Sequence, residues 1–330
     1  MPLFAKKNRY YQGPVSDHFD GTRFFNPGGE TPRGFLDVLK WQMAGGRTRW
    51  SRPQPALPPA RPAPRVDDLT VTMVGHATLL IQVAGVNILT DPVWSDRASP
   101  FQSMGPQRFL PPGIDFQDLP PIDLILLSHN HYDHLDLSTL KRLHATHGAR
   151  IITPLGNDAH LRPHLPGAVI DTVDWGHALP HSPLTLHALP CHHWSARGMG
   201  DRSMSLWAAF MITGPAGNVL HIGDTGFDEG KPYRDLPARF GSVRLAILPI
   251  GAYEPRWFMQ AQHQNPDEAV RGAKLAGARH VIGHHWGTFQ LTDEDRAAPV
   301  RALETALHQH DFPAERFRAL APGEVWTIPA

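Results

Sequence analysis

The 330-residue chain is long enough for one large domain or two modest domains with a substantial buried core. Its 31 basic residues balance 31 acidic residues, so the formal net charge at pH 7 is +0. This balance argues against a nucleic-acid-binding protein and against a purely electrostatic attachment to an anionic membrane. Histidine is the unusual component, with 21 residues.

The single cysteine, Cys191, excludes an internal disulfide framework and indicates a reducing compartment. The N-terminus has no apolar signal region, and the chain has no apolar run of about 18 residues, the length that a membrane-spanning helix needs. We therefore expect a soluble, cytoplasmic protein. Peripheral contact with the inner face of the membrane stays open, and so does the oligomeric state, a homodimer included.

Proline dominates residues 51–65, where apolar periodicity is almost absent, and this composition predicts an extended strap. The part of the chain before it carries aromatic and glycine residues and one expected helix near 34–44. We therefore predict an N-terminal extension over 1–65 that wraps on a main domain of 66–330.

Short apolar runs separated by turns begin near residue 69 and predict many strands. The expected strands are 69–74, 78–83, 86–90, 122–127, 150–153, 168–173, 184–189, 205–213, 218–222, 243–249 and 279–283. Helices are expected at 137–147, where leucines recur at helical spacing, at 265–277 and at 297–309. In the second of these, Asn265 can cap, Pro266 suits the first turn and Glu268 completes a capping box. The mixture predicts two sheets covered by helices.

A cluster of possible metal ligands follows the expected strand at 122–127. His129, His131, Asp133 and His134 have the spacing H-x-H-x-D-H. Imidazole and carboxylate groups are the usual donors to zinc, and a loop at the end of a rigid strand is a common place for them. The alternative is a histidine-rich surface turn. Four donors at this spacing after a buried strand favour a metal site.

Four donors cannot complete two metal sites, so further donors are expected at other strand ends. Three segments qualify, because each places a donor directly after an apolar run: His192 and His193, Asp224 in a Gly-Asp-Thr-Gly turn, and His284 and His285. Taken alone, each could be an ordinary polar loop residue. Their recurrence at the same topological position predicts that the three segments converge on one site.

The order H-x-H-x-D-H, then His, then Gly-Asp, then His resembles the metallo-β-lactamase superfamily of binuclear hydrolases. The stretches TDPVWSDRASPFQSMGPQRF, LPPIDLILLSHNHYDHLD, GDTGF, QHQNPDEAV and HHWGTF are similar to N-acylphosphatidylethanolamine-hydrolysing phospholipase D and its bacterial relatives. This resemblance runs from about residue 70 to residue 290. It implies an α/β fold of αββα type, a sandwich of two mixed β-sheets flanked by helices, with a binuclear metal site at the sheet edge.

The resemblance also sorts the ambiguous histidines, because it favours His193 over His192 and His285 over His284. The ligands that it implies are His129, His131 and His193 for one zinc ion, Asp133, His134 and His285 for a second zinc ion, and Asp224 as a bridge between them.

Two further residues match positions at which the family contacts phospholipid, namely Tyr132 and His263. On sequence alone, Tyr132 could equally be a packed aromatic residue, and His263 an ordinary residue before a helix cap. Asp91 ends a strand and is a candidate acceptor for a ligand histidine. His76 is expected to be structural, and Cys191 to be a small buried residue.

The resemblance implies hydrolysis of N-acylphosphatidylethanolamine-like phospholipids to N-acylethanolamine and phosphatidic acid. Two zinc ions about 3.5–4 Å apart would lower the pKa of a water between them from 15.7 toward roughly 7. Asp133, Asp224 and His263 are the expected catalytic residues, with His263 on the side of the leaving group.

Three other functions compete with this one. The first is another zinc hydrolase of the same fold, such as a lactonase or esterase that attacks a carbonyl group. The second is a redox di-iron protein, which usually carries Glu where His131 stands here. The third is a non-catalytic scaffold, for which seven filled ligand positions are unexpected.

Overall fold

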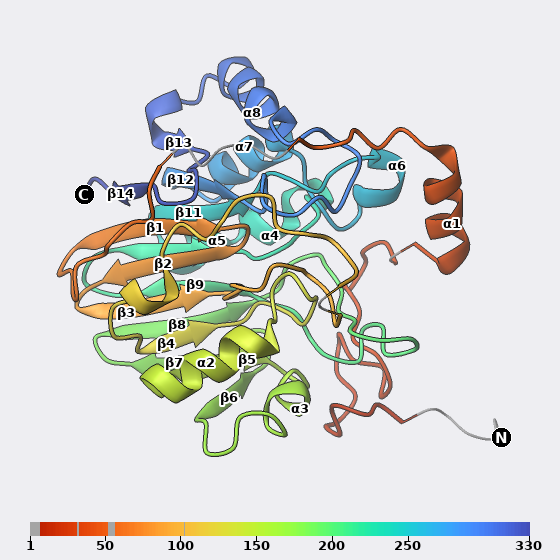
Figure 1. The fold of residues 1–330 in the computed structure, drawn as a ribbon, viewed down its shortest axis with the longest axis horizontal. Helices are drawn as coiled ribbons and strands as arrows, with labels where there is room; N and C mark the ends of the chain where they lie inside the picture. The colour runs from red at the N-terminus through yellow and green to blue at the C-terminus, as the bar shows by residue number, and fades with distance from the viewer. Residues whose placement is uncertain (1–6, 32, 52–56, 102) are drawn as a thin grey trace.

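The computed structural model describes residues 7–31, 33–51, 57–101 and 103–330, and it shows four layers (Figure 1). Two seven-stranded sheets pack face to face, and helices cover the outer face of each. The two mixed sheets confirm the predicted αββα sandwich.

The first sheet has the strand order β14-β1-β2-β3-β4-β5-β6. Its strands are β1 Leu69–Gly75, β2 Thr78–Val83, β3 Val86–Thr90, β4 Leu124–Leu126, β5 Arg150–Pro154, β6 Ile170–Val173 and β14 Val325–Thr327. The strands from β14 to β3 pair antiparallel, whereas those from β3 to β6 pair parallel. A hairpin joins β2 and β3, and Ala84 and Gly85 form its turn with positive φ angles.

The second sheet has the order β13-β12-β11-β10-β9-β8-β7. Its strands are β7 Ala178–His181, β8 Leu184–Leu189, β9 Ala209–Thr213, β10 Asn218–His221, β11 Val243–Pro249, β12 Ala278–His284 and β13 Phe317–Arg318. The strands from β10 to β13 pair parallel. The carboxyl ends of β10 and β12 therefore meet at one edge of the sheet.

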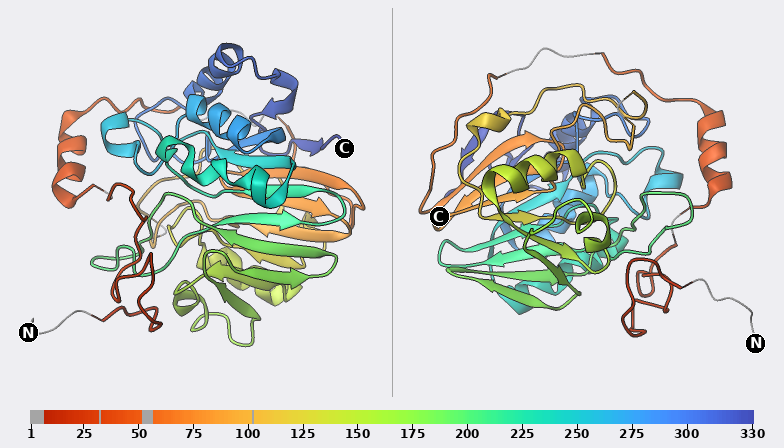
Figure 2. Two further views of the ribbon diagram at one scale, coloured as in Figure 1. Left: turned by 180° about the vertical axis from the view of Figure 1, so that it is seen from behind. Right: turned by 60° about the horizontal axis from the view of Figure 1, so that its bottom comes forward.

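The helices lie outside the two sheets, with α2 and α3 over the first and α4, α5, α7 and α8 over the second (Figures 1 and 2). Their bounds are α1 Phe35–Ala44, α2 Leu137–His147, α3 Asp158–Leu161, α4 Lys231–Arg234, α5 Leu236–Phe240, α6 Arg256–Met259, α7 Pro266–Leu275 and α8 Ala298–Gln309. The part of the chain that the structure describes also contains three short 3-10 helices: η1 Phe116–Asp118, η2 Asp228–Gly230 and η3 Ala314–Arg316. Within the described residues, no helix is both long and apolar enough to cross a bilayer.

Burial on both sides explains why the strands read as continuous apolar runs. In β11, Leu245 and Ile247 pack between the sheets, whereas Ala246 and Leu248 pack against the outer helices. Side chains alternate between the two faces of a strand, so a strand in the middle of four layers needs apolar residues at every position.

The two helices that follow the donor loop and His263 have capped N-termini, of which only the second was predicted. The Asp136 carboxylate accepts from the backbone N–H groups of Ser138 and Thr139 at the start of α2. At the start of α7, Asn265 and Glu268 form the predicted reciprocal capping box, with Pro266 in the first turn.

The strand predicted at 205–213 is wrong in its first half, because β9 begins at Ala209. The preceding backbone bonds to loops instead: Leu206 N–H donates to Leu155 O at 2.8 Å, and Ala208 N–H donates to Ser128 O at 3.0 Å. Apolar content alone could not separate this buried loop from a strand. This buried loop matters for function, because its hydrogen bond to Ser128 O anchors the loop that begins at Ser128.

The N-terminal segment is packed onto the main body. Phe19 and Phe24 are buried in the core beneath the second sheet, and Asn26 donates through its side-chain amide to His193 O at 2.9 Å. Residues 52–56 of the predicted strap lie outside the described residues. Beyond them, Gln82 donates to Ala63 O at 2.8 Å, so this part lies along the first sheet.

Candidate metal centre

Four loops at one edge of the sandwich carry the donors that the sequence singles out. One follows β4 and holds His129, His131, Asp133 and His134, and the other three follow β8, β10 and β12 of the second sheet. Carboxyl ends of parallel strands are the usual location of sites in α/β sheets. The structure brings all seven predicted ligand side chains together here.

The first group consists of three imidazoles, His129, His131 and His193. His131 Nδ1 lies 2.8 Å from His129 Nε2 and 3.2 Å from His193 Nε2. The Nδ1 atom of His193 lies 3.1 Å from Gln262 O, to which it can donate, so its Nε2 lone pair points into the group. Three ring nitrogens at these separations fit the donor set of one tetrahedral ion with an open position.

The second group contains Asp133, His134 and His285. Asp133 Oδ2 lies 3.5 Å from His134 Nε2 and 3.2 Å from His285 Nε2. Asp91 Oδ2 lies 2.9 Å from His134 Nδ1, so that nitrogen donates outward and Nε2 faces inward. Asp91 therefore occupies the orienting position that the sequence suggested for it.

Asp224 stands between the two groups. Its Oδ2 atom lies 3.2 Å from His134 Nε2 and from His285 Nε2, and 3.7 Å from His193 Nε2. It also lies 4.0 Å from His129 Nε2. A carboxylate within reach of both donor groups has the position that a bridging ligand requires.

Unpartnered buried atoms support a bound cation at this site. Asp224 Oδ1, His131 Nε2 and His134 Nε2 are buried and have no hydrogen-bond partner among the described residues. Buried polar atoms without a partner are rare in folded proteins, because each one costs the free energy of its lost hydration. The donor set of imidazoles and carboxylates therefore fits a metal ion of the zinc type.

The protonation states of His129, His193 and Asp224 suit metal binding, whereas His285 would have to release a proton when a metal ion binds. Burial lowers the pKa of His129 and of His193 well below the usual range, which leaves both imidazoles neutral. Burial raises the pKa of the Asp224 carboxyl, but the neighbouring His285 and His134 outweigh it and hold this pKa well below its usual range. Burial alone would lower the pKa of His285, but the carboxylates of Asp224 and Asp133 raise this pKa, and the net value is about 9. Neutral imidazoles and ionised carboxylates are the ligating forms.

Three residues of this region have a strained backbone. His76, Asp91 and His285 have φ angles of 59°, 35° and 62°, although none of them is glycine. Non-glycine residues in this conformation cost free energy, so the surrounding structure must hold them there. One such restraint is the 2.9 Å hydrogen bond from His285 N–H to His76 O.

His76 is the site residue whose role the sequence analysis missed. Its Nε2 atom lies 2.9 Å from Asp133 Oδ2, and its ring lies 4.0 Å from the His285 ring. His76 is thus a fourth member of the second donor group, although the sequence analysis expected a structural residue. Its position directly after β1, like the other donors at strand ends, was the available signal.

In each pair of adjacent histidines, only one residue belongs to a donor group. His193 and His285 enter the donor groups, whereas His192 and His284 belong to none of them. His192 Nδ1 lies 3.0 Å from Asp228 Oδ2, outside the centre. His284 is buried beside His221, with ring centroids 5.5 Å apart.

Glycines on both sides of Asp224 permit close packing of its loop. A Cβ atom on Gly223 would lie 2.6 Å from the Ser128 side chain, and one on Gly226 would lie 2.4 Å from Ala261 O. The Gly-Asp-Thr-Gly turn therefore presses against the His129 loop on one side and the segment before His263 on the other.

The two expected substrate contacts occupy different places. His263 is near the metal ligands, with Nδ1 3.9 Å from Asp224 Oδ2, and burial lowers its pKa to about 4. Tyr132 points away, because its hydroxyl donates to Arg197 O at 2.9 Å and the Arg197 guanidinium lies 4.0 Å from its ring centroid. Tyr132 lines a cavity of about 620 Å³ together with Arg97 and Phe101. Cys191 is buried, as expected, and burial raises the pKa of its thiol.

Comparison with known proteins agrees with this geometry. Residues 86–286 match the family model of the β-lactamase superfamily domain. The chain is 37% identical over 269 residues to N-acyl-phosphatidylethanolamine-hydrolyzing phospholipase D 1 of Caenorhabditis elegans, covering 78% of this chain and 75% of that one. It is 34% identical over 239 residues to the mitochondrial N-acyl-phosphatidylethanolamine-hydrolyzing phospholipase D of Saccharomyces cerevisiae, covering 71% of this chain and 50% of that one. An isothiocyanate hydrolase from Delia radicum gut bacteria has a similar fold, with a TM-score of 0.62, 20% identity and coverage of 79% and 100%.

Proposed function

Because the chain belongs to the metal-dependent hydrolases of the β-lactamase superfamily, and within them to the N-acylphosphatidylethanolamine-hydrolysing phospholipase D family, we propose a zinc-dependent phosphodiesterase. The proposed reaction converts N-acylphosphatidylethanolamine-like phospholipids to N-acylethanolamine and phosphatidic acid. The observation that carries the proposal is the convergence of two donor groups around Asp224 at one sheet edge.

Two ions per chain follow from the two donor groups. His129, His131 and His193 would hold one zinc ion, and Asp133, His134 and His285 would hold the other, with Asp224 between them. Two bound zinc ions would supply an acidified water and neutralise charge on the phosphoryl oxygens. The all-histidine first group also disfavours the di-iron alternative, since softer nitrogen donors suit zinc.

Neighbouring residues of the protein orient the side chains that would bind the metal ions. Asp91 fixes the tautomer of His134, and the carbonyl of Gln262 fixes that of His193. Asp133 is placed by His76, whose Nε2 atom lies 2.9 Å from its carboxylate. These contacts hold each donor nitrogen on the inner side of the centre, so that little reorganisation is required when substrate binds.

The hydrolysis forms a bond from a water oxygen to phosphorus and breaks the bond from phosphorus to the head-group oxygen. The departing N-acylethanolamine oxygen must gain a proton, because an alkoxide is a poor leaving group. His263 is the proposed group on this side. Its side chain keeps 10% of its surface exposed, compared with 0% for His193. With a pKa of about 4 this imidazole is neutral near pH 7, so it would donate a hydrogen bond to the leaving oxygen, while the proton that this oxygen gains balances the one lost by the attacking water.

The cavity beside Tyr132 is the proposed position of the polar part of the substrate. Arg97 and Arg197 line it together with Asp96 and Asp136, so its wall carries both signs of charge, and Phe101 is 57% exposed there. None of the seven predicted metal ligands lines this cavity, so it would hold a part of the substrate next to the phosphodiester group. A wall with polar and apolar groups suits the polar part of a lipid.

Helix α1 is the proposed region of contact with a lipid surface. It lies at the edge of the molecule beside α6 (Figure 1), where Trp41 stacks on Phe258 with ring centroids 5.0 Å apart. Leu36 and Met43 on α1 are 78% and 81% exposed, and Trp257 on α6 is 41% exposed. Exposed apolar residues of this size, grouped on neighbouring helices, are typical of contact surfaces.

Sedimentation with phosphatidylcholine vesicles tests the lipid contact. The double variant Leu36→Ser/Met43→Ser should bind vesicles several-fold more weakly, since each serine removes buried apolar area from the contact. Val169→Ser is the matched control, because Val169 is 57% exposed but lies before β6, away from α1. Equal vesicle binding by the double variant and the control would remove α1 from the proposal.

Hydrolysis in oxygen-18 water tests the reaction itself. Attack on phosphorus should place the label in phosphatidic acid, and the released N-acylethanolamine should carry none. A lactonase or esterase reaction would instead label a carboxylate, and attack at the head-group carbon would label the ethanolamide. Mass spectrometry of the separated products distinguishes these outcomes. Label outside the phosphate would refute the phospholipase D assignment and leave the metal centre intact.

A further inference from the structure

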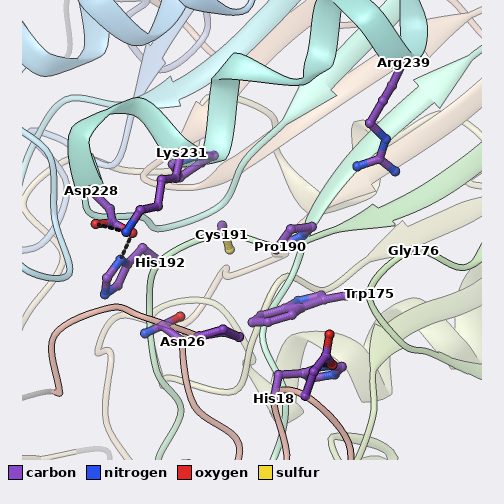
Figure 3. A pocket seen from close by; sticks show the side chains of 13 residues that line it. His18, Asn26, Trp175, Gly176, Pro190, Cys191, His192, Asp228, Lys231 and Arg239 are labelled. Atoms are coloured by element: carbon purple, nitrogen blue, oxygen red, sulfur yellow. Dashed lines mark hydrogen bonds and ion pairs between the residues drawn. The ribbon is translucent and has the colours of Figure 1, made fainter.

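A second cavity lies between the N-terminal segment and the second sheet (Figure 3). Its volume is about 420 Å³, which is within the range of small-molecule sites. Its walls come from 17–27, 175–176, 190–192 and 228–239. None of the seven predicted metal ligands lines it, so it is separate from the site described above.

One wall is flat and apolar. Trp175 is held in place because its indole N–H donates to Trp207 O at 2.6 Å and its ring stacks on His18, with centroids 4.6 Å apart and planes at 27°. Pro190 and Pro232 also line the cavity, and Figure 3 shows Trp175 lying next to Pro190. Rigid rings form a surface on which a planar apolar group can pack without loss of side-chain entropy.

The cavity is lined by two cations, Lys231 and Arg239, and by two carboxylates, Asp17 and Asp228. Asp228 Oδ1 lies 3.1 Å from Lys231 Nζ, and Asp17 Oδ1 lies 2.5 Å from His18 Nδ1, so both carboxylates have partners. Arg239 extends from α5 toward Pro190 (Figure 3), and its guanidinium lies 5.1 Å from the Phe240 ring centroid, with no ion pair to a described residue. A guanidinium without an ion pair beside an apolar wall provides a fork of donors for an anion.

The cavity wall is physically continuous with the metal-binding loops. His192 lines the cavity, while its backbone N–H donates to Thr225 Oγ1 at 2.9 Å and its carbonyl accepts from Gly226 N–H at 2.8 Å. These bonds join the loop of His193 to the loop of Asp224. The same wall contains Asp228, which has a φ angle of 41°, a strained conformation that often marks functional segments.

We propose that this cavity is a second ligand site for a small organic anion with a planar apolar body. The planar body packs on Trp175 and the proline rings, and the anionic group accepts hydrogen bonds from Arg239. A carboxylate and a phosphoryl group offer the same paired acceptor oxygens. This site goes beyond the proposed hydrolysis, and its occupant contacts the outer side of the two loops that present His193 and Asp224.

Isothermal titration of the metal-loaded protein tests the site with three probes: naphthalene-2-carboxylate, naphthalene-2-phosphonate and the uncharged naphthalene-2-carboxamide. At least one anion should bind with one-to-one stoichiometry, and the better of the two identifies the preferred head group. The carboxamide should bind about ten-fold more weakly, since it lacks the charge that strengthens hydrogen bonds to a guanidinium. Arg239→Gln should weaken anion binding by about the same factor.

Arg316→Gln is the matched control, because Arg316 is exposed in η3 at the opposite edge of the second sheet. Lys231→Gln is a second variant, and it should have a smaller effect because Asp228 already neutralises Lys231. Three results would each overturn the proposal: no saturable binding of either anion, equal affinity for the carboxamide, or undiminished anion binding by Arg239→Gln. The last result would place the anion elsewhere, for example on the metal ions.

Discussion

The two sheets supply the candidate metal centre in different ways. At the edge of the first sheet, one loop after β4 provides four donors within six positions, from His129 to His134. At the edge of the second sheet, three separate loops provide one donor each, His193, Asp224 and His285. The first arrangement is local and can be recognised as a motif. The second arrangement depends on strand order, so an assignment of its donors from the sequence can more easily be wrong by one residue.

The largest expected effect on metal content and activity is at Asp224, the carboxylate that lies between the two donor groups. Asp224→Ala should lower the content of both metal ions, because its Oδ2 atom lies 3.2–4.0 Å from ring nitrogens of both donor groups. Activity should fall by more than the roughly 10–100-fold that is typical when an outer partner of a metal ligand is lost. Elemental analysis and turnover measure both effects, with Asp235→Ala as an exposed control. Full metal retention with normal turnover would exclude Asp224 from the centre.

The paired histidines give the sharpest test of the second-sheet contribution. His193→Ala and His285→Ala should each remove one donor nitrogen, reduce metal content and lower turnover more strongly than the neighbouring substitutions. His192→Ala and His284→Ala are the matched controls, since neither side chain belongs to a donor group. Thermal unfolding should be measured for all four, because His284 is buried and its loss creates a cavity. A larger metal loss in the controls would mean that the assignment is shifted by one residue.

A smaller effect is expected at Asp91, which orients a donor without belonging to a donor group. Asp91→Asn keeps the shape but weakens the hydrogen bond to His134 Nδ1. Metal affinity or activity should fall by about 10–100-fold. Asp115→Asn is an exposed control for the same chemical change. Titration with a zinc chelator measures the affinity, and unchanged zinc affinity together with unchanged turnover would show that Asp91 is not needed to orient His134.

The smallest effect on metal content is expected at the substrate contacts. Tyr132→Phe removes a hydroxyl that donates to Arg197 O, and His263→Ala removes an imidazole 3.9 Å from Asp224 Oδ2. Both variants should retain their metal ions and lose activity toward phospholipids. For Tyr132→Phe a loss of several-fold is expected, as for one neutral hydrogen bond of about 1 kcal/mol. A variant that loses metal would reveal that its residue supports the ligands.

Local chemistry could be predicted from particular residues. The donor loop after β4, the caps at Asn265 and Glu268, and the positions of most long strands follow from spacing and composition. Short or exposed elements could not be predicted in this way. Strands β7, β13 and β14 and helices α3 to α6 contain two to five residues, which is too few for a hydrophobic period to appear.

The sequence by itself determined which residues are chemically able to bind a metal ion, because donor type and spacing along one loop are properties of the chain. Tertiary structure alone decided which of them meet. His76 and His285 come from distant segments, yet their rings lie 4.0 Å apart, and Asp224 reaches both donor groups. Such contacts arise from the pairing of strands far apart in sequence and from packing in the core, which no local pattern encodes. For the same reason, the cavity between the N-terminal segment and the second sheet exists only in the folded chain.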